Sequence, residues 1–183
     1  MSIKYAILGF LSWRAFTGYE LKKLFAESAT SGWSGNSNQI YTTLVELHKE
    51  GLVSLEIQPQ EAHPARKVYT ITGKGLAELK SWVLSTSEPP VQKNAFLIQL
   101  AWADQLEAGE MDAWLAQYEE KLQTHLLLFR ARDQRKDAPQ RTPRETYLWN
   151  MISQNWMSFY ENELHWVGTL RAGLVKIEQE DAL

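Results

Sequence analysis

Two groups of polar and basic side chains in the first half of the chain have chemistry suited to binding nucleic acid. The first group opens an amphipathic stretch over residues 37–50 and consists of Ser37, Asn38, Gln39, Tyr41 and Thr42. Asparagine and glutamine amides pair bidentately with adenine in the major groove, and a tyrosine hydroxyl can donate to a phosphate. The free amides of a helix N-terminus also favour phosphate. This group therefore predicts base and backbone contacts with DNA.

The second group is the compact set Pro64, Arg66 and Lys67, which suits phosphates or the edge of the minor groove. Lys22 and Lys23 lie on the outer face of an earlier predicted helix, and we expect them to approach the DNA backbone. Each group has a structural alternative. Residues 36–39 can simply cap a helix, the Arg-Lys pair can be a solvated turn, and the two lysines can be a solvated helix face.

The elements that position these groups are predicted in the order helix, then hairpin. Ile40, Leu44 and Leu47 form an apolar stripe that ends at Gly51, which predicts a recognition helix over about residues 37–50. Residues 52–57 and 67–71 alternate like strands, and residues 58–67 form a wing at their junction. Helices are also predicted over residues 3–13, after the capping box of Thr17 and Glu20, and after a cap over residues 72–75. This order is typical of a winged helix.

The second half of the chain is helical in character and follows a boundary at residues 85–90, which contain adjacent prolines. Helices are predicted over residues 92–104, from 108–110 to about 136, and from about 143 to 180. Heptad-like apolar spacing recurs in the last two, which predicts helices packed along their length, both within the chain and against a second subunit. The residues expected to carry dimerisation are Trp149, Ile152, Trp156, Phe159, Trp166 and Leu170.

The aromatic side chains of the second half have two interpretations. Tryptophans that line helices can form a flat pocket for a small aromatic effector, or they can be core, since heptad aromatics bury large areas. Glu163 interrupts the apolar stripe, and we expect Arg171 or an arginine of a second subunit to be its partner. Glu161 and His165 stand four residues apart, but without a third ligand they predict no metal site.

Composition excludes several classes of protein. There is no cysteine, no apolar run long enough to span a bilayer and no phosphate-loop or catalytic-triad motif, so neither an enzyme nor a membrane protein is expected. A reducing, cytoplasmic setting fits best. The net charge is −3, although residues 1–90 carry nine Lys/Arg against eight Glu. The weak basic excess lies where DNA binding requires it.

Six short motifs in the first half resemble the PadR family of bacterial transcriptional regulators. They are Tyr5-Ala6-Ile7-Leu8-Gly9, Gly18-Tyr19-Glu20-Leu21, Gln39-Ile40-Tyr41-x-x-Leu44, Glu50-Gly51-Leu52-Val53, Pro64-x-Arg66-Lys67-Val68-Tyr69 and Ile71-Thr72-x-x-Gly75. The second half resembles the longer subfamily with a virulence-activator-like C-terminal domain, by its architecture and by Asn94-Ala95-Phe96-Leu97. The chain departs from the family pattern at Thr42, where many members have proline, and at Ala62-His63, where the wing often carries glycines.

The resemblance implies a mainly α fold with a small β-wing. Residues 1–87 are expected to form a winged helix-turn-helix domain, and residues 91–183 a helical dimerisation domain and candidate effector domain. The implied function is that of a homodimeric, sequence-specific regulator that binds double-stranded DNA at a palindromic operator without a cofactor. A second hypothesis stays open: a winged-helix protein-interaction module that has no effector and does not bind DNA directly.

Overall fold

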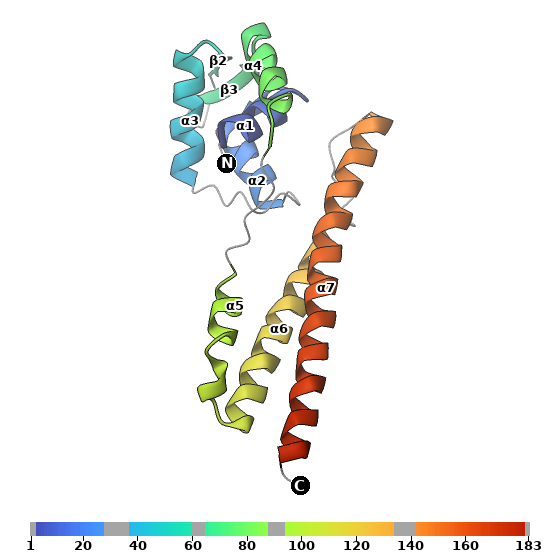
Figure 1. Cartoon of the computed structure of the whole chain (residues 1–183). Helices are drawn as coiled ribbons and strands as arrows, with labels where there is room; N and C mark the ends of the chain where they lie inside the picture. The colour runs from blue at the N-terminus through green and yellow to red at the C-terminus, as the bar shows by residue number, and fades with distance from the viewer. Residues whose placement is uncertain (1–2, 28–36, 60–64, 88–93, 134–141, 182–183) are drawn as a thin grey trace. The chain divides into compact units, whose positions relative to one another are not determined.

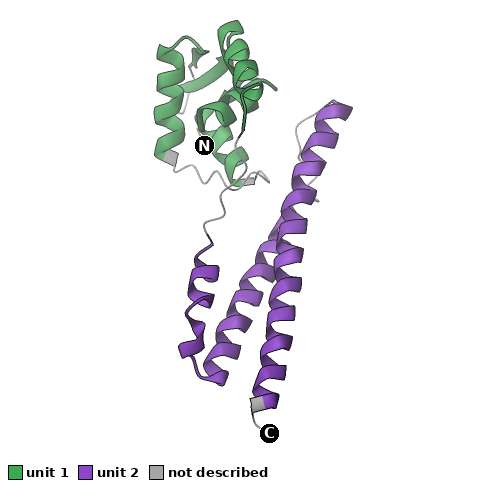
Figure 2. Cartoon of the chain, viewed as in Figure 1, with its two compact units in different colours: residues 1–88 green, residues 89–183 purple. Residues whose placement is uncertain are grey.

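The computed structural model describes residues 3–27, 37–59, 65–87, 94–133 and 142–181 (Figure 1). The chain divides into two compact units, Met1–Glu88 and Pro89–Leu183 (Figure 2). The division falls inside the proline-containing segment that separates the two halves of the sequence. The domain bounds 1–87 and 91–183 and their functional labels stay predictions.

Unit 1 combines four helices with a small antiparallel sheet, within the part of the chain that the structure describes. Its elements are α1 (Ile3–Leu11), β1 (Phe16–Thr17), α2 (Gly18–Glu27), α3 (Ser37–Lys49), β2 (Val53–Gln58), β3 (Arg66–Ile71) and α4 (Gly73–Val83). The strand order is β1-β3-β2, so β3 is the central strand. Phe16 is opposite Tyr69 on one side of β3, and Val53 is opposite Ile71 on the other. The fold class predicted from the sequence is confirmed.

The core of unit 1 joins the three N-terminal helices to the sheet. Apolar residues at helical spacing bring one face of each helix inward, and Leu21 of α2 and Ile40 and Leu44 of α3 are completely buried. Other members of the core include Ile7, Leu8, Phe10, Leu11, Phe16, Phe25, Leu47, Leu52, Val53 and Tyr69. This packing fixes α3 by its apolar stripe and leaves its opposite face toward solvent.

The helix ends in unit 1 follow their sequence signals. Thr17 and Glu20 form the predicted capping box: the Glu20 amide donates to Thr17 Oγ1 at 3.2 Å, and the Thr17 amide donates to Glu20 Oε2 at 2.8 Å. Gly51 follows α3 with a φ of 71°, and the next amide, Leu52, donates to the Leu47 carbonyl. The positive φ of Gly51 and the hydrogen bond from Leu52 to Leu47 together form a Schellman ending. Thr72 caps α4 by accepting from the Gly75 amide.

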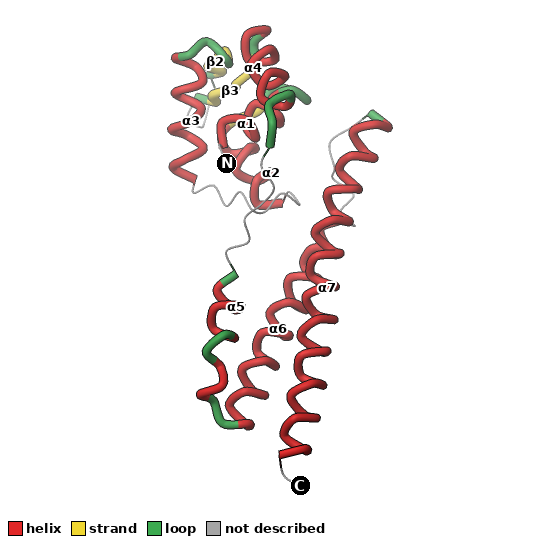
Figure 3. Tube along the Cα trace, in the orientation of Figure 1, coloured by secondary structure: helices red, strands yellow, loops and turns green. Residues whose placement is uncertain are grey.

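Unit 2 is built from helices in its described residues (Figure 3). They are α5 (Ala95–Leu100), the 3-10 helix η1 (Ala103–Gln105), α6 (Ala108–Asp133) and α7 (Pro143–Asp181). The prediction of one helix over residues 92–104 is wrong. The helix ends after Leu100, and η1 begins after Trp102, so that Ala103 becomes buried while Trp102 stays exposed. No glycine or proline marks this break in the sequence.

Helices α6 and α7 pack along their length. Of the predicted stripe of α6, Leu115, Leu122 and Phe129 are buried, whereas His125 is exposed. On α7 the completely buried residue is Val167, whereas Ile152 and Ile177 of the predicted stripe are exposed. The face of α7 that packs on α6 therefore contains Ser153 and Val167, and it lies next to the predicted stripe and not on it. Neither long helix carries a segment apolar enough to cross a membrane, nor does any other helix in the described ranges.

Candidate nucleic-acid interface

The predicted reading residues lie on the solvent-facing side of α3. Asn38, Gln39 and Tyr41 are exposed, whereas the side chain of Ser37 lies outside the described residues. Thr42 is exposed, and its hydroxyl donates to the Asn38 carbonyl at 2.9 Å. The only hydroxyl proton of Thr42 is therefore used within the helix, which leaves this side chain an acceptor and a methyl group to offer to a base.

The ring of Tyr41 lies directly against the first residue of α2. A Cβ added to Gly18 would lie 2.4 Å from Tyr41 Cε1, closer than two carbon atoms can approach. Any larger residue at this position would require the Tyr41 ring to move, because glycine has no side chain. Burial raises the pKa of Tyr69, and the phenol of Tyr41 raises it further. Sequence reasoning assigned Gly18 to a family motif and missed this contact.

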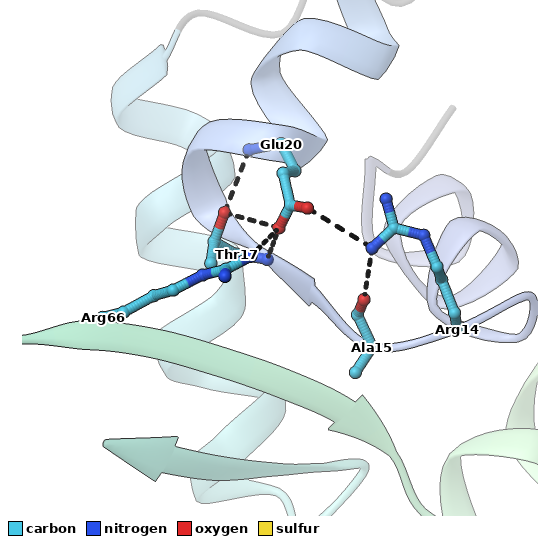
Figure 4. Close-up of polar contacts among 5 residues, drawn as sticks. All are labelled: Arg14, Ala15, Thr17, Glu20 and Arg66. Atoms are coloured by element: carbon cyan, nitrogen blue, oxygen red, sulfur yellow. Dashed lines mark hydrogen bonds and ion pairs between the residues drawn. The ribbon is translucent and has the colours of Figure 1, made fainter. Parts of the chain in front are cut away.

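Glu20 connects the N-terminus of α2 to the turn that precedes it and to Arg66 (Figure 4). Arg66 and Lys67 begin β3, and we call these two residues the base of the wing. Its Oε2 accepts from the Thr17 amide and the Thr17 hydroxyl, each at 2.8 Å, and from Arg66 Nη2 at 3.2 Å. Its Oε1 accepts from Arg14 Nη1 at 3.3 Å. Arg14 also donates to the Ala15 carbonyl and lies over the Phe16 ring. Glu20 thus has a structural role beyond the capping box predicted from the sequence.

The pKa of Glu20 is about 2. Burial alone would raise the pKa of this carboxyl, but the hydrogen bonds from Thr17, Arg66 and Arg14 outweigh it and lower the value. Glu20 is therefore ionised at neutral pH, and its negative charge lies next to Arg66.

The remaining predicted contacts lie on β3 and α2. Arg66 begins β3 opposite Gln58, and Lys67 follows opposite Ile57; both basic side chains are exposed. Pro64 lies outside the described residues. Lys22 and Lys23 are exposed on α2, as their outward position in the helical pattern predicts. The sequence had no signal for the contact between Glu20 and Arg66, because 46 residues separate them.

The aromatic side chains of unit 2 pack on one another. Phe96 of α5 is buried, with its ring centroid 3.6 Å from that of Tyr118 and 4.6 Å from that of Trp114. Trp166 meets the Phe96 ring edge-on. A residue of the chain therefore occupies the centre of this aromatic cluster, which favours the core interpretation. The other interpretation of these residues, a pocket for a small aromatic effector, stays a prediction.

Arg171, one of the two predicted partners of Glu163, is not its partner within the chain, and an arginine of a second subunit stays a prediction. The Tyr118 hydroxyl donates to Glu163 Oε2 at 3.1 Å. Arg171 instead binds two carboxylates of α6, Glu119 at 2.6 Å and Asp112. Because α6 and α7 pack antiparallel, Arg171 lies beside Asp112 and Glu119 in the N-terminal half of α6, and its guanidinium binds these carboxylates and not Glu163. Within the described ranges no group of three or more potential ligands could hold a metal ion.

The fold and the exposed polar face of α3 define a winged helix-turn-helix protein with a separate helical unit. Residues 7–81 match the model of the transcriptional regulator PadR-like family, and residues 92–174 match that of the virulence activator alpha C-terminal domain. The chain belongs to the PadR-like family of transcriptional regulators. This is a family of regulators and not of enzymes, in agreement with the sequence.

Relatives and solved structures agree with this assignment. The negative transcriptional regulator PadR of Bacillus subtilis is 33% identical over 98 residues, which are 53% of this chain and 54% of the relative. The chain thus aligns with about half the length of this curated relative. Two solved structures show the same fold. Bacillus subtilis PadR in complex with operator DNA has a TM-score of 0.82 at 24% identity, covering 93% of this chain and 97% of that one. The Vibrio cholerae virulence activator AphA has a TM-score of 0.72 at 22% identity, covering 96% and 99%.

Proposed function

We propose that this chain binds operator DNA directly and regulates transcription as a homodimer. One chain of contacts supports the proposal most strongly. The Tyr41 ring lies on Gly18, and close by in the sequence Glu20 accepts hydrogen bonds from both Thr17 and Arg66. The exposed face of α3 and the base of the wing thus meet at the N-terminus of α2. A winged helix uses these parts to contact DNA.

Each part has a role in the proposed complex. Helix α3 enters the major groove, where Asn38 and Gln39 read base edges. Tyr41 donates its hydroxyl to a phosphate, and the segment 58–67 follows the backbone or the minor groove through its basic residues. Lys22 and Lys23 approach the backbone from α2. The relative from Bacillus subtilis, solved with operator DNA, supports this assignment by its common fold.

The homodimer is proposed to form through unit 2. The N-terminal half of α7 exposes four large apolar residues within six positions, Tyr147, Leu148, Met151 and Ile152. An exposed apolar patch on a helix marks an interaction surface. Of the six residues expected to carry dimerisation, Trp156, Phe159, Trp166 and Leu170 also contribute to packing within the chain. A dimer presents two reading helices, so the operator is expected to be palindromic, with half-sites one or two helical turns apart.

Fluorescence anisotropy with a labelled random duplex across a salt series tests direct DNA binding. Binding through several phosphates predicts a steep loss of affinity as salt increases. The double variant Arg66→Ala with Lys67→Ala should weaken binding and flatten this dependence. A flat response of the wild-type protein would favour the alternative function, a winged-helix module that binds another protein.

Light scattering at several protein concentrations tests the dimer. The wild-type chain should have twice the mass of one subunit. Ile152→Glu, on the exposed face of α7, should shift the mass toward that of a monomer and weaken operator binding. Gln154→Glu, an equal change of charge on the same helix, should remain dimeric. A wild-type protein that stays monomeric at high concentration would contradict the dimer.

A further inference from the structure

Arg66 and Lys67 are neighbours in the sequence but have different electrostatic surroundings. The guanidinium of Arg66 lies 3.2 Å from the Glu20 carboxylate, with which it forms an ion pair. Within the described residues no ion pair involves Lys67, whose side chain is exposed. The two cations are therefore not equivalent toward an approaching phosphate.

The carboxylate that pairs with Arg66 is fixed in place. Glu20 Oε2 accepts from both the amide and the hydroxyl of Thr17, and Oε1 accepts from Arg14. A side chain held by its own helix cap cannot follow or release Arg66 without losing hydrogen bonds in the first turn of α2. The negative charge of Glu20 therefore stays at the base of the wing when DNA approaches.

We propose that Glu20 is a positioning residue that holds Arg66 against α2 and offsets its charge, so that Lys67 provides the main phosphate contact at the base of the wing. The proposal rests on the DNA-binding function proposed above. A phosphate that approaches the ion pair interacts with the positive charge of Arg66 and the negative charge of Glu20 at similar distances, so the attraction and the repulsion largely cancel. Arg66 then contributes mainly to the contact between β3 and α2, and Lys67 to the release of counterions.

The salt dependence of DNA binding distinguishes the two roles. Each phosphate contact contributes about 0.9 to the slope of log Kobs against log salt on duplex DNA. With the full-length chain and a labelled random duplex, Lys67→Gln should lower the slope by about 0.9 for each wing bound. Arg66→Gln should lower it by less than half as much. An equal loss in the two variants would overturn the proposal.

The same measurement on Glu20→Gln tests the partner. Removing the carboxylate charge should steepen the slope, and adding Arg66→Gln should reverse at least half of the increase. An unchanged slope in a folded Glu20→Gln protein would contradict the proposal, as would an increase that Arg66→Gln does not affect. If Glu20→Gln fails to fold, as judged by circular dichroism, the comparison of Arg66→Gln with Lys67→Gln still decides.

Glu78→Gln is the matched control. Glu78 of α4 pairs with Lys4 at 3.6 Å and accepts from the Tyr5 hydroxyl, so its substitution makes the same change of charge and weakens a similar ion pair elsewhere in unit 1. Its slope should equal that of the wild type, and a slope as steep as that of Glu20→Gln would also overturn the proposal. A wild-type protein that binds no duplex at any salt would instead refute the proposed function itself.

Discussion

Gly18 at the start of α2 lies in van der Waals contact with the ring of Tyr41 on α3, and the ring leaves no space for a Cβ. The start of one helix therefore sets the position of a side chain on the exposed face of the next. Thr17 and Glu20 lie on either side of Gly18 in the sequence. The contact therefore also links α3 to Glu20, which accepts hydrogen bonds from Thr17 and Arg66. The predictions below test this arrangement and the packing that supports it.

Gly18→Ala should weaken both folding and DNA binding. The added methyl group overlaps the Tyr41 ring, which is 45% exposed and must move aside, so the cost in the free energy of unfolding should be about 1 kcal/mol, at the lower end of overpacking. Urea denaturation measures the stability, and anisotropy the affinity. Gly9→Ala is the control, because nothing lies within 4 Å of a Cβ at this position of α1. It should stabilise the protein by about 0.5–1 kcal/mol, and a stabilised Gly18→Ala would contradict the contact.

Tyr41→Phe should separate the hydroxyl from the ring. The ring stays against Gly18, so the free energy of unfolding should remain within about 0.5 kcal/mol of the wild-type value. Loss of a hydrogen bond to a charged phosphate should cost about 1.5–3 kcal/mol of binding, which is a loss of about tenfold or more in affinity. Equal affinity in the variant and the wild type would exclude the phosphate contact.

Acid should destabilise unit 1 partly through Glu20. Its pKa falls from an ordinary value of 4.5 to about 2 in the folded chain, so the ionised form stabilises the fold. This stabilisation is fully present above the unfolded pKa and is lost as pH falls from 4.5 toward 2. Urea unfolding at pH 6 and pH 3 should show a larger loss for the wild type than for Glu20→Gln. Equal losses would mean that the hydrogen bonds to Glu20 are not formed in solution.

Gly75→Ala should be more harmful than Gly73→Ala. A Cβ at Gly75 would lie 2.2 Å from the backbone carbonyl oxygen of Leu52, which cannot rotate away, whereas nothing lies within 4 Å at Gly73. The cost for Gly75→Ala should be about 3 kcal/mol, at the upper end of typical overpacking. Gly73→Ala should be neutral within about 0.5 kcal/mol. Thermal unfolding followed by circular dichroism measures both, and similar melting temperatures would contradict the contact.

Phe96→Ala should destabilise unit 2. The ring is buried between Tyr118 and Trp114, and removal of a buried phenylalanine costs about 3–5 kcal/mol. Leu97→Ala, at an exposed position of the same helix, should cost less than about 1 kcal/mol. Tryptophan fluorescence during urea unfolding follows the change, because Trp114 and Trp166 surround the ring. A small effect at Phe96 would show that α5 is not docked on α6.

The features predictable from the sequence are those determined by residues close together in the chain. The capping box of Thr17 and Glu20, the ending at Gly51 and the cap at Thr72 each depend on a few consecutive residues, and all three occur as expected. The apolar stripe of α3 identified its buried face for a similar reason. Local chemistry was sufficient to place the helices of unit 1 and the two longer strands, but not the break between α5 and η1.

Contacts between distant residues were not predictable. Strand β1 has two residues, too few to show alternation, and it forms only because β3 is beside it. The partner of Glu163 depends on the register between α6 and α7, which heptad spacing leaves open. Aromatic and apolar residues cover more than one face of α7. Heptad spacing therefore did not show which of these faces packs on α6. Neither the contact of Glu20 with Arg66 nor that of Gly18 with Tyr41 leaves a pattern in the sequence.

The central position of β3 has an evolutionary consequence. Because β1 and β2 bond to opposite sides of this strand, its placement is secured by Phe16–Thr17 and Val53–Gln58. Arg66 and Lys67 are exposed at one end of β3, whereas Tyr69 belongs to the core, so changes of charge at the exposed end can accumulate without cost to the hydrophobic core. One end of the central strand is thus free to vary in evolution, while the buried end that anchors it is inherited with the scaffold.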